Sequence, residues 1–299
     1  MFRIVIVSCF LMVGSITLAA GPAEKKAAVE KVKATVEAAL AKAEIKPIGK
    51  AETDHLLVYG TMSDAKVKTI AEAAQKSFAF AAKSLKVEKV DDLFAAKLVV
   101  FIVPDRKPYA NLVQAIDGKR PDQSETYEVK ARGDVPFVSI GTGIGEKPTD
   151  ADIANAAACW TAAAVLNKKL GTDPGAFDLP EWAQLGYGKI ATLRMEGNAA
   201  KLTAFRTKAK SLVNGKLRGP VSIKDAWSGS KGKDHETLVT SVVDFLAFGP
   251  DPERFGKLAL GFKKSDDNRD PSIDRILQSL EWKWDTLDAE WKTYVIKLK

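Results

Sequence analysis

Histidine and cysteine are scarce in this sequence, whose 299 residues include two of each. Most zinc enzymes and most Ser-His or Cys-His nucleophilic enzymes use at least one histidine in their chemistry, and many zinc sites use three. His55 and His235 stand far apart in the chain, and no histidine lies between them. The composition therefore argues against metal chemistry that depends on several histidines.

Aromatic residues are also few, at 8%, whereas 46% of the residues are hydrophobic and 28% are charged. These values are typical of an ordinary globular chain and exclude collagenous, disulfide-rich and disordered classes. The formal net charge of +7 favours anionic ligands or surfaces without naming one.

The chain lacks a long apolar run that would span a membrane. A short basic start is followed by an apolar run from Ile4 to Leu18 and then by small residues, a pattern typical of a secretory signal peptide. The run is shorter than the roughly 20 apolar residues of a spanning helix. We therefore expect residues 1–20 to be a signal peptide. The mature protein should be exported, to the periplasm, the envelope or the medium, without a transmembrane anchor. Cys159 then remains as its single cysteine, which excludes an intrachain disulfide.

The spacing of apolar residues divides the mature chain into three parts. Residues 21–50 are expected to form an amphipathic helix and a linker. Residues 51–148 alternate runs typical of strands with helical patterns and predict an α/β subdomain. From residue 149 to residue 299 the period is helical throughout, and Thr149 and Asp152 have the spacing of a capping box. The fold class is therefore α+β, with a small N-terminal α/β part and a mostly helical C-terminal half.

Two short motifs resemble known sites but lack a required residue. Three glycines within residues 141–145 follow a predicted strand, yet a dinucleotide-binding turn needs its third glycine where Glu146 stands. His235 and Glu236 resemble the start of a zinc motif, but Val239 occupies the position of the second ligand. We interpret the first motif as a glycine turn and the second as the start of a helix.

The stretch from Lys201 to Arg218 contains no acidic residue. One interpretation is a contact surface for an anionic polymer such as envelope phosphate, and the other is a solvated basic face. Phe205 is its single aromatic residue, which argues against nucleic acid, because bases stack on aromatic side chains. The candidate anion-binding residues are Lys201, Arg206, Lys208, Lys210, Lys216 and Arg218.

Residues 179–186, with the sequence LPEWAQLG, resemble the "LPxWxxEG" signature that follows the zinc helix in peptidase MA-like gluzincins, a class of exported or membrane-associated bacterial proteins. Residues 54–59 and 97–103 resemble the first strands of that family. Residues 287–294 resemble its closing "eLexxWxxY" element. The resemblance spans about residues 52 to 299 and implies a zincin-like fold.

In that family, two histidines of an H-E-x-x-H helix and the glutamate of the later "EG" pair hold zinc, and the helix glutamate acts as the base. The resemblance aligns Cys159 and Ala163 with the two histidines, Trp160 with the base and Leu185 with the third ligand. The resemblance therefore implies that the chain has the gluzincin fold but lacks the zinc site, with no catalytic residue, no metal and no cofactor. Because metal ligands face one point, Cys159, Ala163 and Leu185 should converge in a dry apolar contact.

We therefore expect an exported, non-catalytic pseudopeptidase with a binding or structural role in the cell envelope, whose partner is an anionic envelope polymer or another envelope protein. The alternative is an active secreted hydrolase with a site rebuilt in the same cleft from Asp178, Glu181 or Cys159. A cysteine nucleophile needs a base, usually histidine. Hydrogen bonding of Cys159 to His55 or His235 would therefore favour the enzyme.

The degenerate motif makes a prediction about metal content. Structural and catalytic zinc sites need three or four converging ligands, so the purified protein should contain no stoichiometric zinc and no peptidase activity that a chelator abolishes. Elemental analysis and a peptidase assay with and without chelator measure both. One zinc per chain, lost together with an activity on adding chelator, would overturn the pseudopeptidase interpretation.

Overall fold

The fold was analysed in a computed structural model of the chain. It describes residues 22–123, 125–131, 135–143, 145–170, 179–215, 221–227, 234–263 and 272–298. The expected signal peptide, residues 1–20, lies outside these ranges. No helix within them combines the length and the apolar character needed to cross a bilayer.

The described residues form five strands, ten α-helices and two short 3-10 helices. The strands are β1 (Gly49–Glu52), β2 (Leu56–Gly60), β3 (Leu98–Ile102), β4 (Tyr127–Lys130) and β5 (Phe137–Ile140). The first helices are α1 (Pro22–Lys42), α2 (Asp64–Ser84), α3 (Arg106–Asp117), α4 (Asp150–Leu170) and α5 (Glu181–Glu196). The later ones are α6 (Ala199–Val213), α7 (His235–Phe248), α8 (Glu253–Gly261), α9 (Ile273–Ser279) and α10 (Trp284–Lys297). The 3-10 helices are η1 (Val90–Asp92) and η2 (Ile223–Ala226).

All five strands belong to one mixed sheet with the order β1-β2-β3-β5-β4. Strands β2, β3 and β5 are parallel, with Val58, Val100 and Val138 in register. The two edge strands, β1 and β4, run antiparallel to their neighbours. The central strands are buried along their whole length, as expected of parallel strands that are covered on both faces.

Alternate residues of each central strand enter different cores, because successive side chains point to opposite faces of a sheet. Leu57, Val99 and Phe137 join a smaller core with residues of α1 and α3. Val58 and Val100, one position further along their strands, join the larger core, which α2, α4 and the helices after α4 complete.

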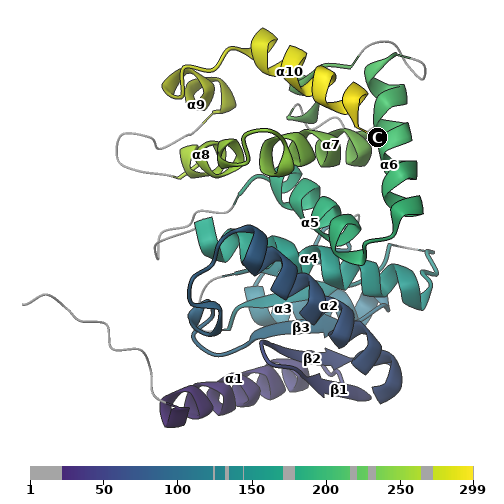
Figure 1. The fold of residues 1–299 in the computed structure, drawn as a ribbon. Coiled ribbons are helices and arrows are strands. Elements are labelled where there is room, and N and C mark those ends of the chain that lie inside the picture. The colour runs from purple at the N-terminus through teal and green to yellow at the C-terminus, as the bar shows by residue number, and fades with distance from the viewer. Residues whose placement is uncertain are drawn as a thin grey trace, which may run out of the picture.

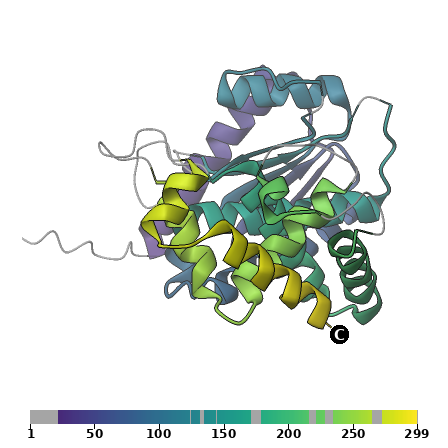
Figure 2. The same ribbon diagram turned by 90° about the horizontal axis from the view of Figure 1, so that it is seen from above.

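The helical half is stacked outward from the sheet. Helix α4 packs against α2, α5 against α4, and α7 against α5, an order that Figure 1 shows from bottom to top. Helix α6 stands at one side of the stack, and α10 crosses its far end beside α6 and α7 (Figures 1 and 2). Four helices from separate parts of the sequence, α4 to α7, thus meet at one side of the molecule.

The structure confirms the mixed α+β class and the order of its two halves. The described strands all precede residue 141, and every described element from Asp150 onward is helical. The capping box at the start of α4 is present, because the Thr149 hydroxyl accepts from the Asp152 amide and the Asp152 carboxylate accepts from the Thr149 amide. Helix α4 packs on β3, β4 and β5, so the half that begins at residue 149 shares its first helix with the core of the α/β part.

The sequence patterns did not locate two elements. Strand β1 begins in the segment expected to be a linker and continues into the predicted α/β part, because pairing with β2 outweighs the weak strand propensity of its Gly-Lys-Ala-Glu sequence. Helix α6 lies in the half predicted to be helical and contains most of the basic stretch. It begins after the left-handed Gly197, and its N-cap Asn198 accepts a hydrogen bond from the Lys201 amide.

A buried ionic cluster holds the last helix in place. Asp244 of α7 is fully buried and accepts hydrogen bonds from the Nε and Nη2 atoms of Arg194, at 2.9 and 2.6 Å. The hydroxyl of Tyr294 in α10 donates to the other carboxylate oxygen at 3.2 Å. Burial, together with the nearby Asp244, raises the pKa of Tyr294 to about 12, so this hydroxyl stays protonated at neutral pH.

Removing the carboxylate should therefore destabilise the fold. Asp244→Ala leaves the partly buried Arg194 without its partner and should lower the free energy of unfolding by about 2 to 4 kcal/mol. The control Tyr294→Phe removes the hydrogen bond to Asp244 and a longer one, at 3.5 Å, from Arg194, and should cost about 1 kcal/mol. Urea denaturation at pH 7 measures both changes. A loss below about 0.5 kcal/mol for Asp244→Ala would contradict the cluster's role.

Candidate functional site

The positions that the family resemblance assigns to a zinc site lie where α4 crosses α5. Cys159 and Ala163 are both buried in α4. The residue of α5 that meets Cys159 is Gly188, where an added Cβ would lie 2.7 Å from the cysteine sulfur. Leu185, three residues earlier, is only partly buried and packs against the same core. The residue of α5 that approaches Cys159 most closely here is therefore a glycine, and Leu185 is not fully buried as expected.

Helix α5 makes a second close approach on its other side. A Cβ added at Gly186 would lie 2.6 Å from a methyl of Val243 and 2.8 Å from the carbonyl oxygen of Val239, both in α7. Because real Cβ atoms do not approach so closely, α5 fits between α4 and α7 only with glycine at these two positions. The two glycines thereby fix the position of Lys189, the next residue of α5.

Trp160, in the position of the family's base, is covered by an edge strand. Its ring stacks on Tyr127 of β4 with centroids 3.5 Å apart, and 5% of the residue is exposed. The Tyr127 hydroxyl donates to Glu181 at 2.6 Å, and burial together with this carboxylate raises the pKa of Tyr127. Glu181, a candidate for a rebuilt hydrolase site, thus already accepts a hydrogen bond from Tyr127. Asp178, the other candidate carboxylate, lies outside the described residues.

Neither histidine forms a hydrogen bond with Cys159. The ring of His55 bonds Gln75 at 2.9 Å and Asp91 at 3.1 Å, and it stacks on Phe78. His55 is therefore a structural histidine. His235 is the first residue of α7, and its Nδ1 atom is buried without a partner among the described residues. Within the same residues, no three His, Cys, Asp or Glu side chains group closely enough to hold a metal ion.

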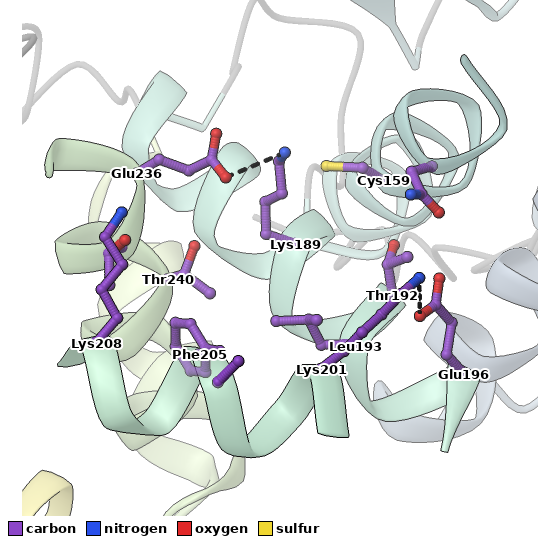
Figure 3. Close-up of a pocket in the computed structure, with 13 residues that line it drawn as sticks. Cys159, Lys189, Thr192, Leu193, Glu196, Lys201, Phe205, Lys208, Glu236 and Thr240 are labelled. Atoms are coloured by element: carbon purple, nitrogen blue, oxygen red, sulfur yellow. Dashed lines mark hydrogen bonds and ion pairs between the residues drawn. The ribbon is translucent and has the colours of Figure 1, made fainter. Parts of the chain in front are cut away.

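A cavity of about 400 Å³ opens where α4, α5, α6 and α7 meet (Figure 3). Its apolar lining includes Leu193 of α5, Phe205 of α6 and the thiol side of Cys159. The polar lining consists of Asn155, Lys189, Thr192, Glu196, Lys201, Lys208, Glu236, Thr237 and Thr240. The cavity thus brings together the cysteine of the predicted zinc helix and two lysines of the predicted basic stretch.

Three ion pairs join the helices around this cavity. Lys189 of α5 contacts Glu236 of α7 at 3.2 Å, and Lys201 of α6 contacts Glu196 of α5 at 2.8 Å; Figure 3 draws both pairs as dashed lines. Lys208 of α6 lies 3.7 Å from Asp234, the N-cap residue of α7. The third contact is the longest, and its carboxylate does not line the cavity.

These pairs change the interpretation of the basic stretch. Carboxylates from outside the stretch offset the charges of Lys201 and Lys208. Arg206 and Lys210 are partly buried, and Arg206 interacts with other residues. Lys216 and Arg218 lie outside the described residues. The described part of the stretch is therefore less basic in three dimensions than its sequence suggests.

Burial and neighbouring charges together set the protonation of Cys159 and Lys189, two ionisable groups of the cavity lining. Cys159 is 1% exposed, and burial raises the pKa of its thiol to about 12 despite the nearby Lys189. For Lys189, burial acts to lower the pKa, but Cys159 and Glu236 outweigh it and the net shift is upward. At neutral pH the cavity therefore holds a neutral thiol beside an ammonium group.

The comparisons with known proteins identify no relative. No protein-family model matches the chain, and neither the curated proteins nor the solved structures give a significant match.

The raised pKa predicts an unreactive thiol. In a Cys9→Ser background, a thiol-specific disulfide reagent should label Cys159 slowly in the folded protein and rapidly after urea unfolding. Because a pKa of about 12 leaves almost no thiolate, the native rate should also stay low between pH 7 and pH 9. Absorbance of the released chromophore measures the rate. Rapid stoichiometric labelling of native protein at pH 7 would instead indicate an activated nucleophile.

Proposed function

We propose that this chain is an exported, non-catalytic binding protein on a peptidase MA-like, gluzincin-type scaffold, and that its ligand site is the cavity between α4 and α7. The scaffold assignment is supported by the order of elements, in which a mixed sheet precedes α4 and the LPEWAQLG segment leads into α5. Export is supported by the basic and apolar start of the sequence.

The chemistry of the helix crossing favours binding over catalysis. A nucleophilic cysteine needs a lowered pKa and a base within hydrogen-bond reach. Cys159 has a raised pKa and no hydrogen bond to histidine, and Gly188 packs directly against it. Trp160, where the family has its base, is a stacked hydrophobic residue. Neither group can activate water or attack a carbonyl carbon.

The observation that carries the proposal is the cavity itself. Ligand sites of soluble proteins are concave, largely apolar and supplied with a few polar groups, with volumes of roughly 300 to 1,000 Å³. The cavity of about 400 Å³ has an apolar floor, charged side chains from three helices and threonine hydroxyls. It is therefore suited to a small molecule rather than to a polymer.

A cavity-blocking substitution tests this function. Ala204 of α6 lines the cavity and is exposed, so Ala204→Trp should fill the mouth without disturbing the core. Wild-type protein is incubated with the low-molecular-mass fraction of an envelope extract. Native mass spectrometry should then show the protein mass increased by that of a bound small molecule. The Ala204→Trp variant should lose it.

Thr203→Trp is the matched control, because Thr203 is an exposed neighbour on the same helix that does not line the cavity. It should keep the bound mass. Absence of any bound mass on the wild type, or equal retention by Ala204→Trp and Thr203→Trp, would contradict the proposed site.

A further inference from the structure

The charges that line the cavity do not cancel. Its ionic side chains are three lysines, Lys189, Lys201 and Lys208, and two glutamates, Glu196 and Glu236. Lys189 and Lys201 each contact one of these glutamates. Lys208 has its carboxylate partner, Asp234, outside the lining. Within the cavity, therefore, one positive charge is not matched by a lining carboxylate.

Lys208 also forms the longest ion pair of the three lysines that line the cavity. Its Nζ atom lies 3.7 Å from the Asp234 carboxylate, beyond the usual length of an N–H···O hydrogen bond. The side chain is 48% exposed, so an incoming anion reaches the ammonium group without first breaking a short ion pair. By contrast, the Lys201 pair is 2.8 Å long.

Two threonines of α7 that line the same cavity as this lysine have hydroxyl groups available for hydrogen bonds. Thr237 and Thr240 of α7 line the cavity, with 7% and 2% of their surface exposed. Within the described part of the chain, neither hydroxyl forms a hydrogen bond, whereas the Thr192 hydroxyl on α5 donates to the Gly188 carbonyl. Figure 3 places Thr240 next to Lys208 on the same side of the cavity. Hydroxyl donors next to an ammonium group suit the oxygens of an anionic head group.

Another part of the lining is apolar. Leu193 and Phe205 line the cavity below the Lys189–Glu236 pair in the view of Figure 3, and the thiol of Cys159, which also lines it, is neutral. A ligand that reaches from Lys208 across this surface must therefore carry its charge at one end and an apolar body at the other.

The geometry points to a small amphipathic monoanion as the ligand of this cavity. Its carboxylate-like or sulfonate-like head binds Lys208 with Thr237 and Thr240, and its apolar body covers Leu193 and Phe205. This assignment rests on the proposed binding function and adds the chemical class of the ligand. Because lining glutamates offset the charges of Lys189 and Lys201, the lining presents one excess positive charge, which suits a monoanion better than a multiply charged anion.

A pair of fluorescent dyes tests the charge requirement. The anion 8-anilinonaphthalene-1-sulfonate and the neutral N-phenyl-1-naphthylamine share an aromatic framework and differ in the sulfonate. Titrated into the full chain, the anionic dye should bind with one site and at least about fivefold more tightly than the neutral dye, the usual effect of one charge-assisted hydrogen bond.

Variants on α6 distinguish the contribution of the charged head group from binding in the cavity as such. Lys208→Gln should weaken the anionic dye about fivefold or more and change the neutral dye less than about twofold. Lys210→Gln is the matched control, because Lys210 lies on the same helix outside the lining, and it should leave both dyes unchanged. Ala204→Trp should weaken both dyes.

The outcomes that contradict the two proposals differ. If both dyes bind equally and Ala204→Trp weakens both, the cavity binds ligands but the monoanion class is wrong. Equal weakening of the anionic dye by Lys208→Gln and Lys210→Gln also overturns the class, because it indicates a general effect of surface charge. If Ala204→Trp leaves both dyes unchanged, or neither dye binds, the cavity is not a ligand site and the proposed function fails with the inference.

Discussion

The close packing of α5 between α4 and α7 is the constraint on which the rest of the helical half depends. Gly188 allows the approach to Cys159, and Gly186 allows the approach to Val239 and Val243. Any larger side chain at either glycine would push the helices apart, because the atoms that a Cβ would meet include backbone and buried core atoms. The same packing sets where Lys189 and Leu193 stand, and so shapes one wall of the cavity.

The three ion pairs around the cavity determine its charge more than its stability. Each pair connects a different two of the helices α5, α6 and α7. Their side chains are substantially exposed in at least one partner, and exposed pairs contribute about 0 to 1 kcal/mol each. Stability comes instead from the core and from the fully buried Asp244. The two shorter pairs fix the directions of Lys189 and Lys201, and Lys208, 3.7 Å from Asp234, is the most available cation of the lining.

Local patterns predicted most of the fold. The alternating strand and helix patterns of residues 51–148 predicted the α/β part that contains β3, and the spacing of Thr149 and Asp152 predicted the start of α4. The helical period after residue 149 includes α6, but the bounds of this helix were not predicted. Gly197 and Asn198 are typical of a helix end and a helix start, and Leu202, Phe205 and Ala209 have helical spacing. Strand β1 carries no such local signal, because its formation depends on the free edge of β2.

The candidate site was predictable only in pieces. Cys159 was singled out by the family resemblance, and Lys201 and Lys208 by the absence of acidic neighbours. Their convergence with Glu196, Glu236 and Thr240 depends on how four helices pack, and no spacing in the sequence encodes it. The ion pair between Lys208 and Asp234 likewise depends on the tertiary structure. A charge run read from sequence therefore overstates how basic the folded surface is.

The central claim is that the space between α4, α5, α6 and α7 is a ligand site for a small amphipathic monoanion. A crystal structure of the chain saturated with 8-anilinonaphthalene-1-sulfonate tests it most directly. The account predicts the sulfonate within hydrogen-bond distance of the Lys208 ammonium, and the rings against Leu193 and Phe205. Dye in the smaller cavity of about 210 Å³ beside Tyr187 and Phe248, or only on the outer surface, would contradict it.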